Sequence, residues 1–272
     1  MSTNAAPVVA AHRVPPSRGW QWIVDAWALT DSQRPLFAGL AVALIVVTAV
    51  GAEIPFVGSF AAALVTPVLS AGLMFGCDAL SRGERLTLDH LFAGFERQTR
   101  RLLALGAVFA VCNLVLTTLG DLIVQPGDLD LLLEMLVGVF FGGATPDLAI
   151  IQLVMVRFLL ATLVVSALSL PLYMALWFAI PLIALRGLDV ARAMKISVAA
   201  CVENTMPFLV WSVPPLLFTI VIVAPLSIAI AIRSLLLGLV AVLPLVFGGV
   251  LLAALTFASM YTSYRDLFAL GE

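Results

Sequence analysis

Six long apolar segments, separated by short polar stretches, dominate the sequence. A helix needs about 20 apolar residues to cross the roughly 30 Å hydrocarbon core of a bilayer. The segments lack the alternation of a barrel strand, and backbone groups in lipid must bond internally. The pattern therefore predicts an all-α polytopic membrane bundle with six transmembrane helices. The predicted spans are Pro35 to Gly51, Pro55 to Leu80, Leu102 to Val124, Phe158 to Leu185, Pro207 to Ile230 and Leu235 to Tyr261.

A short amphipathic stretch precedes each odd-numbered span. Its apolar residues recur at spacings of three and four, which predicts a helix lying in the plane of the membrane interface. The second and third stretches open on Leu88-Asp89 and Leu188-Asp189, and we expect both aspartates to be N-caps. The apolar faces consist of Trp20, Trp22, Ile23 and Trp27; of Leu88, Leu91, Phe92 and Phe95; and of Val190, Ala193, Met194 and Val198.

The even-numbered spans share a short sequence motif that contains proline. Pro67 and Pro171 each lie fifteen residues before an arginine, Arg82 and Arg186 respectively, and Pro244 recurs in the last span. We interpret the chain as three pseudo-repeated hairpins, each introduced by an interfacial helix. The alternative is that Pro and Leu, which are common in membrane helices, recur by chance.

An insertion between the third and fourth spans interrupts the repeat. Its apolar run, Leu131 to Phe141, is too short to cross the bilayer, so we expect an interfacial or re-entrant helix on the non-cytoplasmic side. Leu148 to Val156 is expected to extend the fourth span outward. The predicted organisation is a flexible cytoplasmic tail (1–16) and one membrane domain (17–272), with repeat units of about 17–80, 86–185 and 188–268 and the insertion at 125–157.

The positions of positive charge orient the chain. Arg and Lys gather before the first span, after the second, after the fourth and after the last. The connection after the third span is acidic and carries no Arg or Lys before Arg157, and Arg233 is the cation expected on that same side. The positive-inside rule places the arginine-rich side in the cytoplasm. No apolar core of a signal peptide precedes the first span, so both termini are expected in the cytoplasm.

Composition agrees with a membrane protein and offers little for catalysis. The chain is 62% apolar and 11% charged with a mean hydropathy of +1.14, against roughly 25% charged residues in soluble domains. Its net charge of −2 argues against a nucleic-acid partner. Three cysteines without a CxxC spacing indicate neither disulfides nor zinc. Two histidines and no HExxH, GxSxG or Walker motif leave no catalytic, metal or cofactor residue to predict, and we expect a protein that is not an enzyme.

Six residues are candidates for a functional or interface role. Arg157 is one because an ionisable group in a membrane segment indicates function by default, although counting back about 20 to 25 residues from Arg186 places it at the outer interface, within reach of an acid of the insertion. Glu53 lies in the turn between the first two spans, where a solvated turn residue is the alternative to a ligand. Asn113 gives the third span a polar position, with helix packing as the alternative to a substrate path. The other three lie on the cytoplasmic face: Arg97, Arg100 and Arg101.

Two kinds of function follow from these features. The recognisable sequence words lie mostly near the arginine-rich face, which favours a structural, partner-binding or lipid-interacting protein. Its expected partners are the lipid bilayer and either another membrane protein or a second copy of the chain. The alternative is a transporter or lipid-handling protein with a path past Asn113 and the proline breaks. No acidic residue lies near the middle of those spans, where a proton- or sodium-coupled carrier would need one.

Four sequence words carry a resemblance to a known group. The chain resembles an uncharacterised family of six-span bacterial inner-membrane proteins and, more distantly, the membrane domain that precedes some glycerophosphodiester phosphodiesterases. The resemblance implies the six-span fold over nearly the whole chain, a place in the bacterial inner membrane, and no activity, since the catalytic domain of those phosphodiesterases is absent here. The words are Arg18-Gly19-Trp20-Gln21-Trp22, Thr66 to Met74, Leu91-Phe92-Ala93-Gly94-Phe95 and Ala258 to Phe268.

Overall fold

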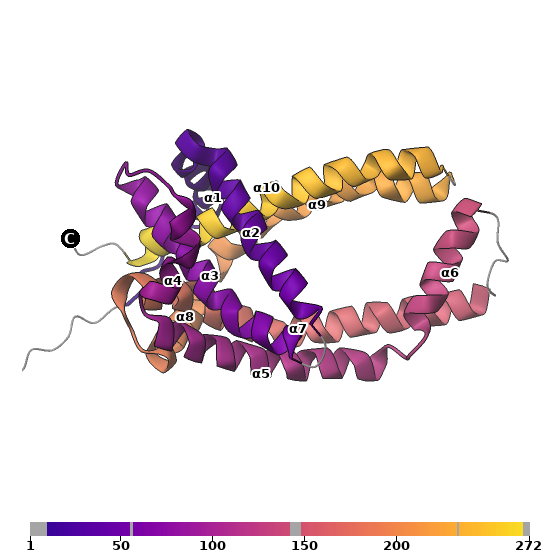
Figure 1. Ribbon diagram of the computed structural model, residues 1–272, viewed down its shortest axis with the longest axis horizontal. Helices are drawn as coiled ribbons and strands as arrows, with labels where there is room; N and C mark the ends of the chain where they lie inside the picture. The colour runs from indigo at the N-terminus through magenta and orange to yellow at the C-terminus, as the bar shows by residue number, and fades with distance from the viewer. Residues whose placement is uncertain (1–9, 55–56, 142–147, 233, 269–272) are drawn as a thin grey trace, which may run out of the picture. The chain divides into compact units, whose positions relative to one another are not determined.

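The computed structural model describes residues 10–54, 57–141, 148–232 and 234–268, and in these ranges every regular element is a helix (Figure 1). Six of the helices are long and apolar enough to cross a membrane. The predicted all-α membrane bundle is therefore confirmed. The six long helices are α2 (Arg34–Ala52), α3 (Gly58–Ser81), α5 (Thr99–Ile123), α7 (Leu148–Arg186), α9 (Thr205–Ala231) and α10 (Leu235–Phe268).

Short helices precede the odd-numbered spans, as the amphipathic stretches predicted. The Asp189 carboxylate accepts a hydrogen bond from the Arg192 N–H and so caps the third short helix as expected. The cap expected at Asp89 is wrong. Thr87 precedes that helix and forms a capping box with His90, whose Nδ1 accepts the Thr87 N–H. The short helices before the odd-numbered spans are α1 (Arg18–Leu29), η1 (Asp31–Gln33), η2 (Leu88–Phe92), α4 (Ala93–Glu96) and α8 (Val190–Glu203). A further short helix, α6 (Asp128–Phe141), lies in the insertion before α7.

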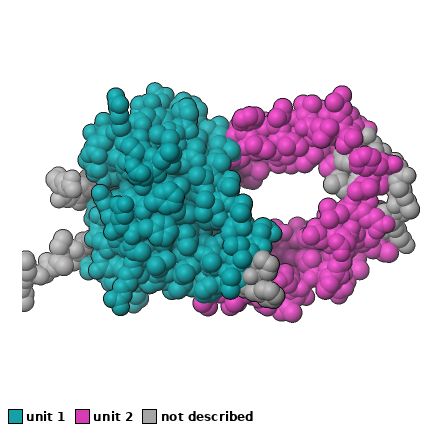
Figure 2. All heavy atoms as spheres, viewed as in Figure 1, with its two compact units in different colours: residues 1–110, 171–215, 250–272 teal, residues 111–170, 216–249 magenta. Residues whose placement is uncertain are grey.

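The chain divides into two compact units (Figure 2). The first comprises residues 1–110, 171–215 and 250–272, and it contains α1, α4 and α8. The second comprises residues 111–170 and 216–249, including α6. The boundary between the two units falls inside α5, α7, α9 and α10, so each of these helices contributes to both units. The three predicted repeat units, which follow the order of the chain, remain a prediction.

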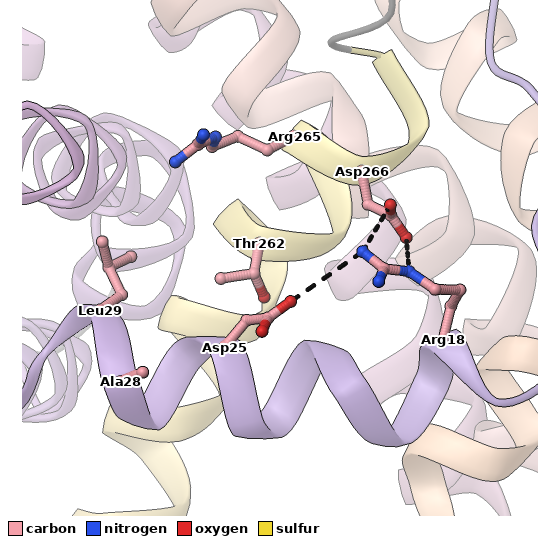
Figure 3. Close-up of a pocket in the computed structure, with 7 residues that line it drawn as sticks. All are labelled: Arg18, Asp25, Ala28, Leu29, Thr262, Arg265 and Asp266. Atoms are coloured by element: carbon pink, nitrogen blue, oxygen red, sulfur yellow. Dashed lines mark hydrogen bonds and ion pairs between the residues drawn. The ribbon is translucent and has the colours of Figure 1, made fainter.

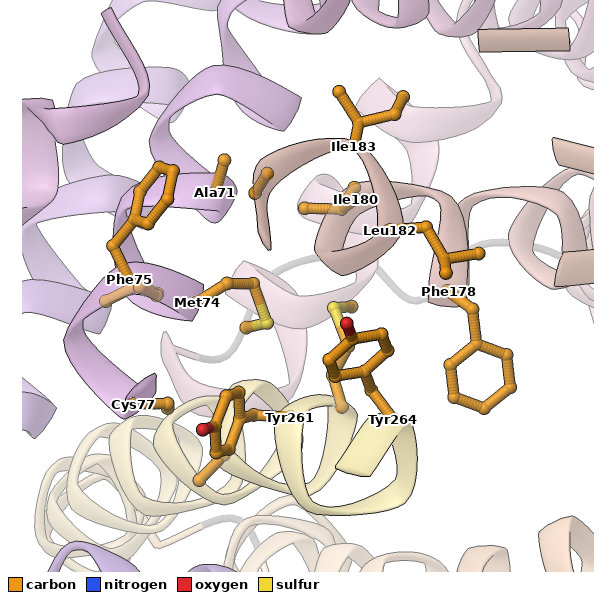
Figure 4. Close-up of a cluster of buried hydrophobic side chains, with 14 of the residues drawn as sticks. Ala71, Met74, Phe75, Cys77, Phe178, Ile180, Leu182, Ile183, Tyr261 and Tyr264 are labelled. Atoms are coloured by element: carbon orange, nitrogen blue, oxygen red, sulfur yellow. The ribbon is translucent and has the colours of Figure 1, made fainter. Parts of the chain in front are cut away.

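Helix α3 is the centre of the first unit. Of its most apolar stretch 67% is buried, against 11 to 22% for the other five spans. Met74 and Cys77 from α3 pack in one cluster with Leu182 from α7 and Tyr261 from α10 (Figure 4). Apolar side chains gain little by leaving lipid for another helix, so close packing itself must hold such an assembly.

Within the first unit, α1, α4 and α8 each dock on an even-numbered span. Helix α4 packs on α3, where a Cβ on Gly94 would lie 2.1 Å from the Val68 carbonyl oxygen. Gly72 faces η2 in the same way, 2.4 Å from the Leu91 carbonyl oxygen. Glycine at these two positions, Gly94 and Gly72, lets the backbones approach closely. Helix α8 docks on α7 and α1 docks on α10, through the polar contacts described below.

The tail requires a correction. Residues 1–16 were expected to be flexible, and residues 1–9 lie outside the described part of the chain. His12 and Val14 are nevertheless fixed, because the Val14 N–H donates to Asn204 Oδ1 at 3.0 Å and the Asn204 amide donates to the His12 carbonyl oxygen at 3.3 Å. The His12 N–H also donates to the Leu267 carbonyl oxygen. A buried amide between α8 and α9 thus orders the last residues of the tail.

Candidate functional site at the short-helix end

The end of the first unit at which α1, α4 and α8 lie is called the short-helix end (Figure 1). There an ion pair joins α1 to α10. Both oxygens of the Asp266 carboxylate accept from Arg18, with Nε at 2.8 Å and Nη2 at 2.7 Å. The indole N–H of the fully buried Trp22 donates to the same carboxylate at 2.8 Å. The Thr262 hydroxyl completes the contact by donating to the Trp22 carbonyl oxygen. Three donors on one carboxylate make this a strong, oriented clasp.

A groove of about 530 Å³ opens beside this clasp (Figure 3). Asp25 reaches toward Arg18 from α1 at 4.0 Å, while the Arg265 side chain points away from Asp266. The hydrogen bond with Asp266 is the main cause that raises the pKa of Arg18, so this guanidinium stays charged at every physiological pH. Arg18 is held in its ion pair with Asp266, whereas Arg265 is an exposed cation that lines the groove.

Aromatic rings fill the space behind the clasp. Phe208 of α9 contacts Trp22, Trp177 and Phe178 with ring centroids 5.2, 5.7 and 5.8 Å apart. Trp177 also contacts Trp211 at 4.9 Å. These tilted and edge-on arrangements are the favourable ones for aromatic pairs. The cluster joins α1, α7 and α9 at one level of the first unit.

Polar contacts also join the ends of the three even-numbered spans. The Tyr261 hydroxyl of α10 lies 2.9 Å from the Ser81 hydroxyl and 3.1 Å from Asp78 Oδ1, both on α3. Arg186, the last residue of α7, donates to the Tyr264 hydroxyl and to the Phe268 carbonyl oxygen. The ends of α3, α7 and α10 are therefore linked pairwise through α10.

Helix α8 is fixed to α7 by a buried serine. The Ser197 hydroxyl donates to the Met174 carbonyl oxygen at 2.6 Å and accepts the Phe178 N–H at 2.9 Å. Those two backbone groups are the pair that an α-helix joins directly, so Ser197 bridges one rung of the α7 ladder. Burial raises the pKa of the neighbouring Cys201 thiol to about 12, which keeps that thiol neutral and unreactive.

The three candidate arginines differ in what they contact. Arg101 donates to the Gly187 carbonyl oxygen at 2.7 Å and to Gln98 at 2.6 Å, and so it holds the turn after α7. Arg97 lies over the Phe75 ring at 5.3 Å and lines a polar pocket of about 210 Å³. Arg100 is exposed on the surface. Arg97 and Arg100 thus remain candidates for contacts outside the protein.

Arg157 pairs with an acid of the insertion. Its Nη1 lies 3.1 Å from Asp128 Oδ1, and Asp128 is the buried first residue of α6. Asp128 also accepts the Gln125 N–H. The pair ties α6 to α7 within the second unit, and this contact has the geometry of a structural ion pair.

Asn113 and Glu53 take no part in the side-chain contacts described above. Asn113 lies half-buried on α5, in the part that belongs to the second unit. Glu53 is exposed at the end of α2, where its N–H donates to the Val50 carbonyl oxygen. Arg233, the other cation expected on the far side, lies outside the described residues.

Sequence reasoning did not single out the residues that organise this end. They are Asp266, Asn204 and Ser197. Each is a polar residue in or beside an apolar helix, and a buried polar group must find a partner. That signal was available for Asp266, which stands in one of the words that carry the family resemblance, but its partner Arg18 is 248 positions away.

Comparison with known proteins supports the membrane class. No protein-family model matches the chain, and no solved structure was found to match it. A probable inner membrane protein of Burkholderia thailandensis is 26% identical over 223 residues, which cover 80% of this chain and 79% of that protein. With its six membrane-capable helices, the chain is a multi-pass integral protein of the inner membrane. The distant resemblance to the phosphodiesterase membrane domain stays a prediction.

Proposed function

We propose that the chain is a non-enzymatic inner-membrane protein that presents three short helices, α1, α4 and α8, on the cytoplasmic side to anionic membrane lipid. The observation that carries this proposal is the two-sided character of these helices. Each buries one face on a span and leaves large apolar side chains exposed on another: Trp20 (54%) and Trp27 (43%) on α1, Phe92 (54%) beside α4 and Val202 (58%) on α8.

The exposed apolar side chains lie next to cations, as expected of a lipid-facing interface. Arg34 stacks on Trp27 at 3.7 Å, and Arg97 and Arg100 follow Phe92 and Phe95. Aromatic rings favour the headgroup level of a bilayer, and a Lys or Arg near an anionic leaflet contributes about 1 kcal/mol. Because each of these helices is docked on a span through its buried face, its exposed aromatic and cationic side chains are held in place.

The length of α7 is consistent with that placement. Its 39 residues make it about 58 Å long, about twice the roughly 30 Å hydrocarbon thickness. A tilt of about 60° would be needed to immerse it fully, above the 0 to 40° range of membrane helices. With Arg157 at the outer interface, about 20 residues along α7 reach Trp177. Under the proposal, the part of α7 that follows Trp177 lies beyond the hydrocarbon core.

Charge reversal of Arg97 and Arg100 tests the proposal. The protein would be placed in nanodiscs of mixed phosphatidylglycerol and phosphatidylcholine, and the retained lipids measured by native mass spectrometry. We expect the double Arg→Glu variant to lower the phosphatidylglycerol preference at least tenfold, because two favourable contacts of about 1 kcal/mol each become repulsive. The double Arg→Lys variant keeps the charge and should keep the preference. Arg101 is left intact because it holds the turn after α7. An unchanged preference in the Arg→Glu variant would overturn the proposal.

The transporter alternative stays a prediction. It requires a polar cavity that reaches Asn113, and the groove beside Arg18 and the pocket beside Arg97 are lined by other residues. A protein partner and a homo-oligomer likewise stay predictions.

A further inference from the structure

A shallow groove of about 580 Å³ runs along α8, beside Ala175 of α7. Small residues, Ala175 and Ala199, line it together with Met194 and Val198. Lys195 stands at one end of the groove and Glu203 at the other. The groove is therefore apolar along its length, with charge confined to the two ends.

The cations of α8 and its exposed apolar side chains lie toward opposite ends of the helix. Arg192 and Lys195 are exposed and one turn apart near the start of α8, while Val202 and Met206 are exposed near its end, where α9 begins. About 10 Å of helix separates Lys195 from Val202. A cation followed by apolar surface at this spacing matches the order of headgroup and acyl chain in a phospholipid.

The acid of the groove does not neutralise that cation. Glu203 lies two turns along the helix from Lys195, and its carboxylate is 4.0 Å from Arg13. In the part of the chain that the structure describes, Lys195 forms no ion pair within 4.0 Å. Lys195 can therefore present its ammonium group to an external anion.

The wall of the groove is rigid because Ser197 anchors α8. The serine is fully buried and bonded to both Met174 and Phe178 of α7, and Ala175 of the groove directly follows Met174. A preorganised surface loses less free energy on binding than a mobile one.

We propose that this α8 groove binds one anionic phospholipid, with its phosphate at Lys195 and Arg192 and an acyl chain along Ala199 and Val198. The assignment rests on the proposed function and gives it a specific site.

The sequence supplies its own reporter, because Lys195 is the one lysine in the chain. The full-length protein in nanodiscs would be treated with an amine-acylating reagent, and modification of the Lys195 peptide would be followed by mass spectrometry. We expect acylation to slow at least fivefold when phosphatidylglycerol is included in phosphatidylcholine discs. An Ala199→Phe variant, which fills the groove, should lose that protection. A Gly39→Phe variant should keep it, because the space around Gly39 in α2 is open.

The outcomes separate the site from the general function. Protection that persists in Ala199→Phe would come from the surface potential alone and would overturn the site. Absent protection overturns it too, and the Arg97 and Arg100 variants then decide whether the proposed function stands without it. Should Ala199→Phe fail to fold, Lys195→Gln replaces it, and the site predicts an at least fivefold loss of tightly bound phosphatidylglycerol by native mass spectrometry. Lys195→Arg should retain the lipid, and equal retention by the Gln variant would refute the site.

Discussion

Replacing Asp266 by asparagine tests whether the clasp between α1 and α10 holds the short-helix end together. The carboxylate accepts three hydrogen bonds, two from Arg18 and one from Trp22, and its side chain is 16% exposed. An amide retains one acceptor oxygen, loses the charge, and turns an N–H₂ group toward the guanidinium.

The expected cost follows from these contacts. Breaking a buried ion pair costs about 3 to 5 kcal/mol, and hydrogen bonds to charged groups contribute about 1.5 to 3 kcal/mol each. The Arg18 side chain is 32% exposed, so water compensates part of the loss. We therefore expect α1 to open more easily by about 2 to 3 kcal/mol, which is about 30- to 150-fold at about 1.4 kcal/mol per tenfold change.

Hydrogen exchange measures this opening directly. Backbone amides of Arg18–Leu29 should exchange about 30- to 150-fold faster in Asp266→Asn than in the parent protein, in the regime where exchange reports the opening equilibrium. Asp25→Asn is the matched control, because Asp25 lies in the same groove, is 53% exposed and reaches Arg18 only at 4.0 Å. It should change exchange less than about threefold. Exchange in Asp266→Asn within threefold of the parent would show that the clasp does not hold α1.

Three further predictions test other contacts. Cys201 should react with a maleimide at pH 8 about a thousandfold more slowly in the folded than in the denatured protein, because a thiol pKa of about 12 leaves almost no thiolate; equal rates would contradict the burial. Gly94→Ala should lower the unfolding temperature by several degrees, since its Cβ meets a carbonyl oxygen at 2.1 Å, whereas Gly39→Ala should be neutral or stabilising; equal effects would refute the close approach. Arg157→Leu should raise proteolysis of α6 by leaving Asp128 unpaired, and Arg157→Leu with Asp128→Leu should restore resistance; a double variant no better than the single one would count against a structural pair.

Much of the fold could be predicted from local sequence. Bilayer thickness dictates how long an apolar run must be, so the six spans are visible in composition alone. The cap of α8 is equally local, because Asp189 and the Arg192 N–H lie three residues apart. The cap at Asp89 was wrong for a local reason as well, since Thr87, two residues earlier, caps the helix together with His90.

The candidate site could be predicted only in outline. The arginine-rich face was visible, but the roles of its arginines were not. Arg101 resembles Arg100 in sequence, yet it holds a carbonyl oxygen 86 positions away at Gly187. No spacing rule connects residues so far apart, and the sequence therefore could not tell a structural arginine from one free to meet lipid.

By itself the sequence determined that this chain is a six-span membrane protein with short amphipathic helices before its odd-numbered spans. Those features depend on periodicity and length, which each segment carries alone. Only the tertiary structure decided which polar groups inside the bundle are partners: Asp266 with Arg18 and Trp22, Asn204 with the tail, and Ser197 with the α7 backbone. The physical reason is that a buried polar group must be satisfied, but any of several distant donors could satisfy it until packing brings one of them near.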